Sequence, residues 1–82
     1  MYQTIGETIS VLGIFRETSF VTKTFHWHNR AYPIEEITSI HEVKDESIKK
    51  RRYAVLSNGN LYLLEYNRTT ETWILEQIWM EG

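Results

Sequence analysis

The chain has 82 residues, a length that suits a single domain, residues 1–82, and leaves little room for a closed catalytic pocket. Hydrophobic residues make up 41% of it and aromatic residues 13%, which is enough for a compact core without cross-links. Cysteine is absent, which excludes disulfides and thiolate metal sites, and the formal net charge of -2 provides no general attraction to nucleic acid or anionic lipid.

The sequence also lacks the patterns that direct a protein out of the cytosol. No charged-then-apolar leader opens it, and no apolar run approaches the roughly 18 residues that a membrane span needs. The lack of cysteine fits a reducing compartment. We therefore expect a cytoplasmic protein.

Short alternating runs rich in Thr, Val, Ile and aromatic residues predict an all-β meander. A first strand is expected over about residues 7–15, with a bulge or bend at Gly13. A second is expected over about residues 20–27. Because side chains alternate along a strand, one face of the second strand would carry Val21, Lys23, Phe25 and Trp27.

Residues 25–34 read FHWHNRAYPI and concentrate aromatic and histidine side chains at a hairpin. We expect a loop over residues 28–31, which pairs Trp27 with Tyr32 and places Pro33 opposite His26, where no N–H is needed. In this arrangement His26 points away from the core. The core-facing side would carry Phe25, Trp27, Tyr32 and Ile34.

The segment that follows, residues 33–50, allows two interpretations. Isoleucines recur every three residues and Pro33 could open a helix, but partners four residues apart are missing and β-branched residues are frequent. This favours a strand over about residues 31–43 with a bulge near Glu35 and Glu36. The charged residues 44–50 would then form a surface loop.

The clearest turn is Asn58-Gly59, because a two-residue type I′ turn needs positive φ at both positions. It predicts a hairpin with four facing pairs: Leu56 with Leu61, Val55 with Tyr62, Ala54 with Leu63, and Tyr53 with Leu64. Both faces of this hairpin are apolar, which indicates a rolled sheet. With a last strand over TWILEQIW, residues 72–79, we predict about six antiparallel strands in a small, partly open barrel.

Two groups of residues resemble the pattern of a known family. The first is F-x-W-x-[GN]-R-x-Y-x-[IV]-x-E-[IV] over residues 25–37; the second comprises Tyr53-x-Val55, Asn58-Gly59, Leu61, Tyr66 and Trp73-x-Leu75. Together they cover most of residues 9–75 and resemble a family of small bacterial all-β proteins of unassigned function. Members typically carry Gly where Asn29 stands, and the loop between the third and fourth strands is shorter and less basic here. Some relatives resemble proteins encoded near translesion-polymerase genes, so the resemblance implies a link to DNA repair.

His26 and His28 are the candidates for metal binding, since side chains two apart on a strand align. A third ligand would have to come from His41, Glu35 or Glu36. Because the expected loop begins at His28 and breaks the alignment, we expect neither a metal nor another cofactor.

The run KKRRY, residues 49–53, is the strongest nucleic-acid signal. A compact basic run beside an aromatic ring can hold phosphates while the ring stacks on a base. The other interpretation is a solvated strand entry that protects a sheet edge from aggregation. The residues concerned are Lys49, Lys50, Arg51, Arg52 and Tyr53, with Arg30 as a further cation.

Catalytic motifs are lacking. Glu35 and Glu36 are adjacent and would point to opposite faces, and no serine, glycine-rich loop or zinc-hydrolase spacing has a recognisable context. We therefore predict a non-enzymatic binding module whose partner is a protein, contacted through a sheet edge or through the hairpin tip at His28, Arg30 and Tyr32. The alternative is a single-stranded nucleic-acid-binding module that uses the basic run.

Overall fold

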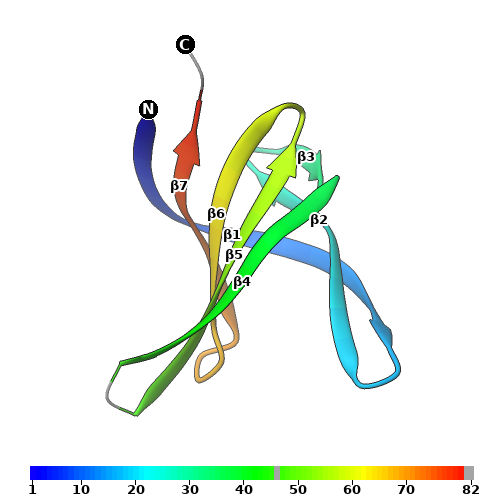
Figure 1. Ribbon diagram of the computed structural model, residues 1–82, viewed down its shortest axis with the longest axis vertical. Coiled ribbons are helices and arrows are strands. Elements are labelled where there is room, and N and C mark those ends of the chain that lie inside the picture. Colours follow the sequence, from blue (N-terminus) through cyan, green and yellow to red (C-terminus); the bar gives the residue numbers. More distant parts are fainter. Residues whose placement is uncertain (46, 81–82) are drawn as a thin grey trace.

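The computed structural model describes residues 1–45 and 47–80, in which seven strands form one antiparallel sheet (Figure 1). The strand order is β3-β2-β1-β7-β6-β5-β4. This confirms the all-β prediction, with one strand more than expected. The strands are β1 (Tyr2–Arg16), β2 (Ser19–Trp27), β3 (Arg30–Pro33), β4 (Glu36–Asp45), β5 (Ile48–Ser57), β6 (Asn60–Asn67) and β7 (Thr72–Trp79).

The sheet rolls up because its two end strands are neighbours in the chain. Only residues 34–35 separate β3 from β4, although these strands lie at opposite ends of the sheet order. At this junction the Ile34 N–H donates to the Lys23 carbonyl and the Glu35 N–H to the Leu56 carbonyl, both at 2.8 Å. The edges therefore meet at one point, below which β2 and β4 run apart in Figure 1, as a partly open barrel requires.

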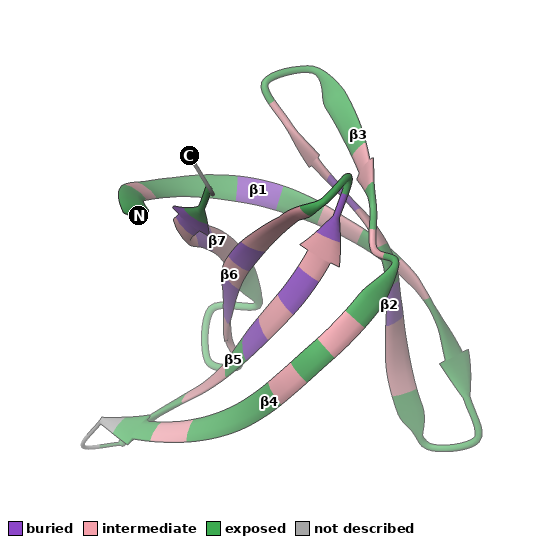
Figure 2. Ribbon diagram, turned by 45° about the horizontal axis from the view of Figure 1, so that its top comes forward, coloured by how far each residue is buried: buried purple, intermediate pink, exposed green. Residues whose placement is uncertain are grey.

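The core lies on the concave face of the rolled sheet. Figure 2 shows buried positions alternating with less buried ones along β5, because successive side chains point to opposite faces. The Asn58-Gly59 turn has φ of 50° and 82°, and all four predicted pairs of its hairpin are confirmed. The buried apolar residues are Ile9, Phe25, Tyr53, Val55, Tyr62, Leu64, Leu75 and Ile78.

The hairpin between β2 and β3 differs from the prediction in its register. Its loop is the two residues His28 and Asn29, with φ of 52° and 61°, so Phe25 faces Tyr32 and Pro33 faces Thr24. The predicted four-residue loop is therefore wrong. Hydrogen-bonded pairs alternate with non-hydrogen-bonded pairs along the ladder, and the two-residue loop already places Pro33 at a pair that needs no N–H. The predicted core-facing side of this hairpin is confirmed: Phe25 is buried, and three further side chains pack on the core, namely Trp27, Tyr32 and Ile34.

The segment from residue 31 to residue 50 contains no helix in its described part. The single strand expected over residues 31–43 is instead two strands: β3, which pairs with β2, and β4, which pairs with β5. The bulge lies at Thr38. The expected surface loop over residues 44–50 is wrong, since β4 extends to Asp45 and β5 begins at Ile48. Lys44, Lys49 and Lys50 therefore lie on paired strands rather than in a loop.

The predicted irregularity at Gly13 is confirmed as a β-bulge between β1 and β2. Leu12 faces Thr24 and Gly13 faces Thr22, so Lys23 is the extra residue. The bulge switches the faces of β2, and Thr22 is buried while Lys23 is exposed. The prediction that Lys23 shares the face of Phe25 is therefore wrong.

Candidate binding surfaces

Side-chain contacts hold the tip of the β2–β3 hairpin against β1. His28 Nε2 lies 3.0 Å from Glu7 Oε1, the Trp27 indole N–H donates to the same oxygen at 3.4 Å, and the two rings stack with centroids 4.2 Å apart. Tyr32 stacks on the buried ring of Phe25 at 4.9 Å. Of the predicted tip residues, His28 and Arg30 are exposed and Tyr32 contributes mainly to packing.

The histidines do not converge. His28 occupies the turn and contacts Glu7, while His41 lies on β4 opposite Arg52. Among residues 1–45 and 47–80, no three His, Asp or Glu side chains are placed to hold a metal ion together. The His26 and His28 pair therefore has no third ligand in the described part of the chain.

The basic run is divided between the two faces of β5. Lys50 and Arg52 point to the convex face, where both contact the buried carboxylate of Glu65, Lys50 Nζ at 3.4 Å and Arg52 Nε at 2.8 Å. Arg51 alternates with them and shares the concave face with Tyr53. The run is thus two small groups of cations and not one continuous patch.

A cleft of about 830 Å³ opens on the concave side, between the start of β2 and the sheet formed by β4 to β7. Trp73 forms part of its lining, with ring centroids 5.2 Å from Tyr53 and 4.7 Å from Tyr66. Sequence reasoning identified Tyr53 and Arg51 but not their neighbours, which come from other strands. The remaining lining mixes apolar residues, Phe15, Phe20, Val21, Ile37 and Ile40, with polar ones, Thr18, Ser19, Arg68 and Glu71.

One carboxylate organises the cations of this cleft. Glu42 Oε1 accepts hydrogen bonds from Arg51 Nη2 at 2.6 Å and Nε at 2.9 Å, and Glu42 Oε2 lies 3.7 Å from Arg68 Nη1. The hydrogen bond from Arg51 is the main reason that the pKa of Glu42 is lowered. Glu42 therefore holds both guanidinium groups at the cleft.

We expect the titration of Glu42 to report this contact. Because its folded pKa lies below the ordinary value of 4.5, its stabilising contribution is present at neutral pH and is lost as the pH falls through the folded pKa. Replacing Arg51→Gln should return the pKa toward 4.5, measured by NMR of the side-chain carboxyl carbon. Lys49→Gln is the matched control and should change it less, since Lys49 acts only through its charge. An unchanged pKa in Arg51→Gln would contradict the assigned contact.

The free edge of β4 borders the same cleft. β4 is ten residues long, and within the described chain it pairs with β5 alone. The Lys49 carbonyl accepts a hydrogen bond from the Arg68 N–H at 2.9 Å, so the N–H and C=O groups of Lys49 point away from β4. Lys44 is paired with Lys49, so this pair is not hydrogen-bonded and the N–H and C=O groups of Lys44 point to the free edge. By the same alternation, Ile40 and Glu42 also direct their N–H and C=O groups outward.

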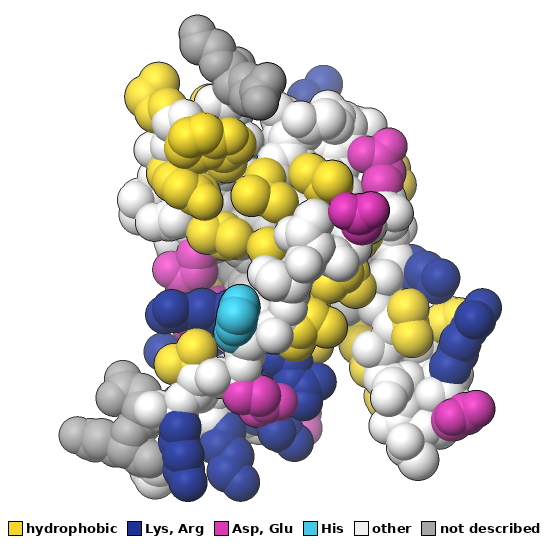
Figure 3. Space-filling model, viewed as in Figure 1, with side chains coloured by type: hydrophobic (Ala, Val, Ile, Leu, Met, Phe, Trp, Pro, Cys, Tyr) yellow, Lys and Arg dark blue, Asp and Glu magenta, His cyan; other side chains and the backbone are white. Residues whose placement is uncertain are grey.

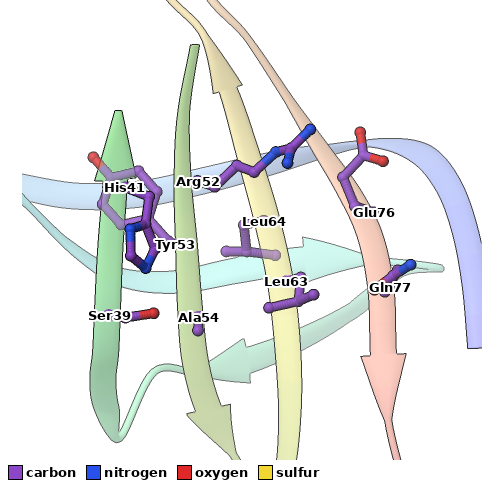
Figure 4. Close-up of a pocket in the computed structure, with 9 residues that line it drawn as sticks. All are labelled: Ser39, His41, Arg52, Tyr53, Ala54, Leu63, Leu64, Glu76 and Gln77. Atoms are coloured by element: carbon purple, nitrogen blue, oxygen red, sulfur yellow. The ribbon is translucent and has the colours of Figure 1, made fainter. Parts of the chain in front are cut away.

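The convex face carries a second, smaller groove of about 300 Å³ (Figure 4). Ala54 of β5 and Leu63 of β6 line it, and the Arg52 side chain extends over β6 toward Glu76 of β7. The irregular pairing near Leu63 and Leu64 leaves Glu76 as an extra residue of β7. This groove is separate from the concave cleft.

Comparison of the chain with family models, with curated proteins and with solved structures gave no match. The described residues contain no helix, and so none that is long and apolar enough to cross a membrane. The surfaces themselves are therefore the basis for a functional assignment.

Proposed function

We propose that the protein is a non-enzymatic binding module that takes up an extended segment of a partner protein as an additional strand on β4. The observation that carries this proposal is the ten-residue free edge of β4 beside a cleft whose lining includes exposed Ile40 and several aromatic residues. Main-chain hydrogen bonds to such an edge provide affinity, and pockets for alternate side chains provide specificity. The hairpin tip is the less suitable surface, because His28 and Trp27 already contact Glu7.

The chemistry of the cleft indicates which segment would fit. Side chains on one face of an added strand would enter a space lined by Ile40, Phe20 and Trp73, so apolar residues at every second position are favoured. Ile40 is 51% exposed although it lies on the concave side, and an added strand would cover it. Exposed apolar residues on a free edge usually carry an aggregation risk, which a bound partner strand removes.

Selection of displayed random peptides of about ten residues, the length of β4, tests the proposal. We expect enriched peptides to show alternating apolar residues and to lose binding to Ile40→Lys, which places a charge in the cleft, and to Lys44→Pro, which removes an outward N–H. Leu12→Lys, an exposed position on β1, is the control and should bind normally. Enriched peptides that bind Ile40→Lys as well as the original chain would count against the β4 edge.

Single-stranded nucleic acid is the second candidate ligand. The observation in its favour is that Arg51 and Arg68 line the same cleft as the rings of Tyr53, Tyr66 and Trp73. Against it stand the net charge of -2 and the engagement of both guanidinium groups by Glu42.

Salt dependence distinguishes the two ligands. Neutralising about three phosphates at roughly -0.7 each would give a log-log slope of affinity against salt near about -2 for labelled oligo-dT. Arg68→Gln should flatten that slope, whereas capture of an apolar strand depends little on salt. We expect no change in fluorescence anisotropy at about 100 μM protein and low salt, which corresponds to binding weaker than roughly -5 kcal/mol.

Two broader assignments accompany this proposal. The lack of cysteine supports a cytoplasmic location. The motif residues around Trp27 and Asn58-Gly59 support membership of the family of small bacterial all-β proteins that the chain resembles, with the association with DNA repair that the resemblance implies.

A further inference from the structure

The concave face of β4 changes from apolar to charged along the strand. Ile40 lines the cleft beside the aromatic rings, and Glu42 pairs with Arg51 two residues further along. Lys44 and its partner Lys49 come next on the same face, since side chains two apart on a strand point the same way. Figure 3 shows Lys and Arg side chains gathered toward the lower end of the molecule, where Figure 1 places the far end of the β4–β5 hairpin.

Lys44 and Lys49 form a facing pair of like charges. Their pair is not hydrogen-bonded, which is the closer of the two kinds of antiparallel pair, and like charges directly opposite each other are destabilising. Among the side chains of residues 1–44 and 47–80, neither lysine forms an ion pair. An anion beside Lys44 would therefore offset the repulsion between the two ammonium groups.

Neither Glu42 nor Glu71 supplies that anion. Glu42 contacts Arg51 at 2.6 Å and Arg68 at 3.7 Å, so its carboxylate is already engaged by two guanidinium groups. Glu71 lines the cleft from the β6–β7 turn, and β6 is two strands away from β4 in the sheet order. A further carboxylate is thus favoured beside Lys44, at the free edge of the sheet.

The backbone of β4 determines which residue of an added strand would lie there. Ile40, Glu42 and Lys44 direct their N–H and C=O groups outward, so each would face one residue of an antiparallel strand in a hydrogen-bonded pair. Every strand pair within the sheet is antiparallel, and this direction is the one that continues it. An antiparallel strand passes Lys44 first and reaches Ile40 four residues later.

We infer that the partner segment bound at β4 carries an acidic residue opposite Lys44 and, four residues closer to its C-terminus, an apolar residue opposite Ile40. The inference rests on the proposed function, which supplies the added strand, and it adds the direction, register and charge of that strand. Opposite charges that face each other across two strands attract, and an apolar side chain opposite Ile40 enters the cleft. The position between them, opposite Glu42, suits a neutral polar residue.

Parallel selections of displayed random ten-residue peptides on the original chain and on Lys44→Glu test the inference. Peptides from the original chain should carry Asp or Glu four residues before an apolar residue, and peptides from Lys44→Glu should carry Lys or Arg there. Lys23→Glu is the matched control and should select the acidic pattern. Lys23 is exposed and lies near residue 34, at the other end of the β4 edge.

The two proposals fail in different ways. Enriched peptides without an acidic preference at this position would overturn the inference and leave the proposed function standing. A selection that enriches no peptide on the original chain would overturn both.

Fluorescence anisotropy with one enriched, labelled peptide measures the contact. Exchange of its acidic residue for Lys should weaken binding to the original chain about two- to fivefold and strengthen binding to Lys44→Glu. The preference should disappear in about 1 M NaCl, where the Debye length is about 3 Å. The peptide exchange on the original chain needs no variant, so it decides the question even if Lys44→Glu does not fold. Equal affinity of the original chain for the acidic and the Lys peptide at low salt would overturn the inference.

Discussion

Phe25→Ala should remove a large part of the domain's stability. Phe25 is 0% exposed, stacks on Tyr32 at 4.9 Å and meets the ring of Tyr62 edge to face at 5.1 Å, so it joins the β2–β3 hairpin to β6 across the barrel. Truncating a buried phenylalanine costs about 3 to 5 kcal/mol. The whole domain, at roughly 0.05 to 0.15 kcal/mol per residue, has on the order of 4 to 12 kcal/mol of stability.

Thermal unfolding followed by circular dichroism measures this effect. For a domain of this size each kcal/mol shifts the midpoint by about 4 to 8 °C, so a loss on the order of 20 °C is expected. Phe15→Ala is the matched control: Phe15 is 78% exposed and touches Phe20, and its loss should cost no more than about 1 kcal/mol. Similar midpoints for the two variants would show that Phe25 is not the centre of the core.

The hairpins show how far local sequence determines this fold. Asn58-Gly59 adopts positive φ with little strain, and this one dipeptide was enough to predict the register of β5 and β6. His28 and Asn29 adopt the same kind of turn with a weaker signal, and Pro33 suggested a longer loop. The core-facing side was nevertheless right, because a two-residue and a four-residue loop both leave Phe25 and Tyr32 on the same face.

The longer-range arrangement could be predicted only in outline. Apolar residues on both faces of the β5–β6 hairpin indicated a rolled sheet, but not that residues 34–35 would join its two edges. The period of two along a strand already implied that Arg51 and Arg52 point to opposite faces. What each one meets, Glu42 or Glu65, depends on the neighbouring strands and has no signal within the run itself.

The concave cleft was beyond prediction for the same reason. Its lining combines Phe20 of β2, Ile40 of β4, Tyr66 of β6 and Trp73 of β7, which are far apart in the chain. Each of these residues has an ordinary place in an alternating strand. These four residues surround an open space because β2 and β4 diverge beyond residues 34–35. The cleft therefore depends on how the strands are arranged and has no signal in any one segment.

Gly13→Ala should separate β1 from β2 and lower stability by about 3 kcal/mol, near the upper end of the usual cost of overpacking. A Cβ on Gly13 would overlap the Val21 carbonyl oxygen and lie 2.7 Å from Phe20 Cζ. The overlapping oxygen belongs to the backbone of the paired strand, so a side-chain rotation cannot relieve the contact. The change also disturbs the bulge at Lys23, which brings Thr22 into the interior.

Urea unfolding measures this cost as a shift of the midpoint at constant slope. Gly6→Asn is the control, since Gly6 has φ of 68° with nothing within 4 Å of an added Cβ, and asparagine tolerates the left-handed region. Its midpoint should change little. Because β1 and β2 form one wall of the cleft through Phe15 and Phe20, a folded Gly13→Ala protein should also bind selected peptides less tightly. A midpoint equal to that of the original chain would show that Val21 does not approach Gly13 and that the strands pair without this bulge.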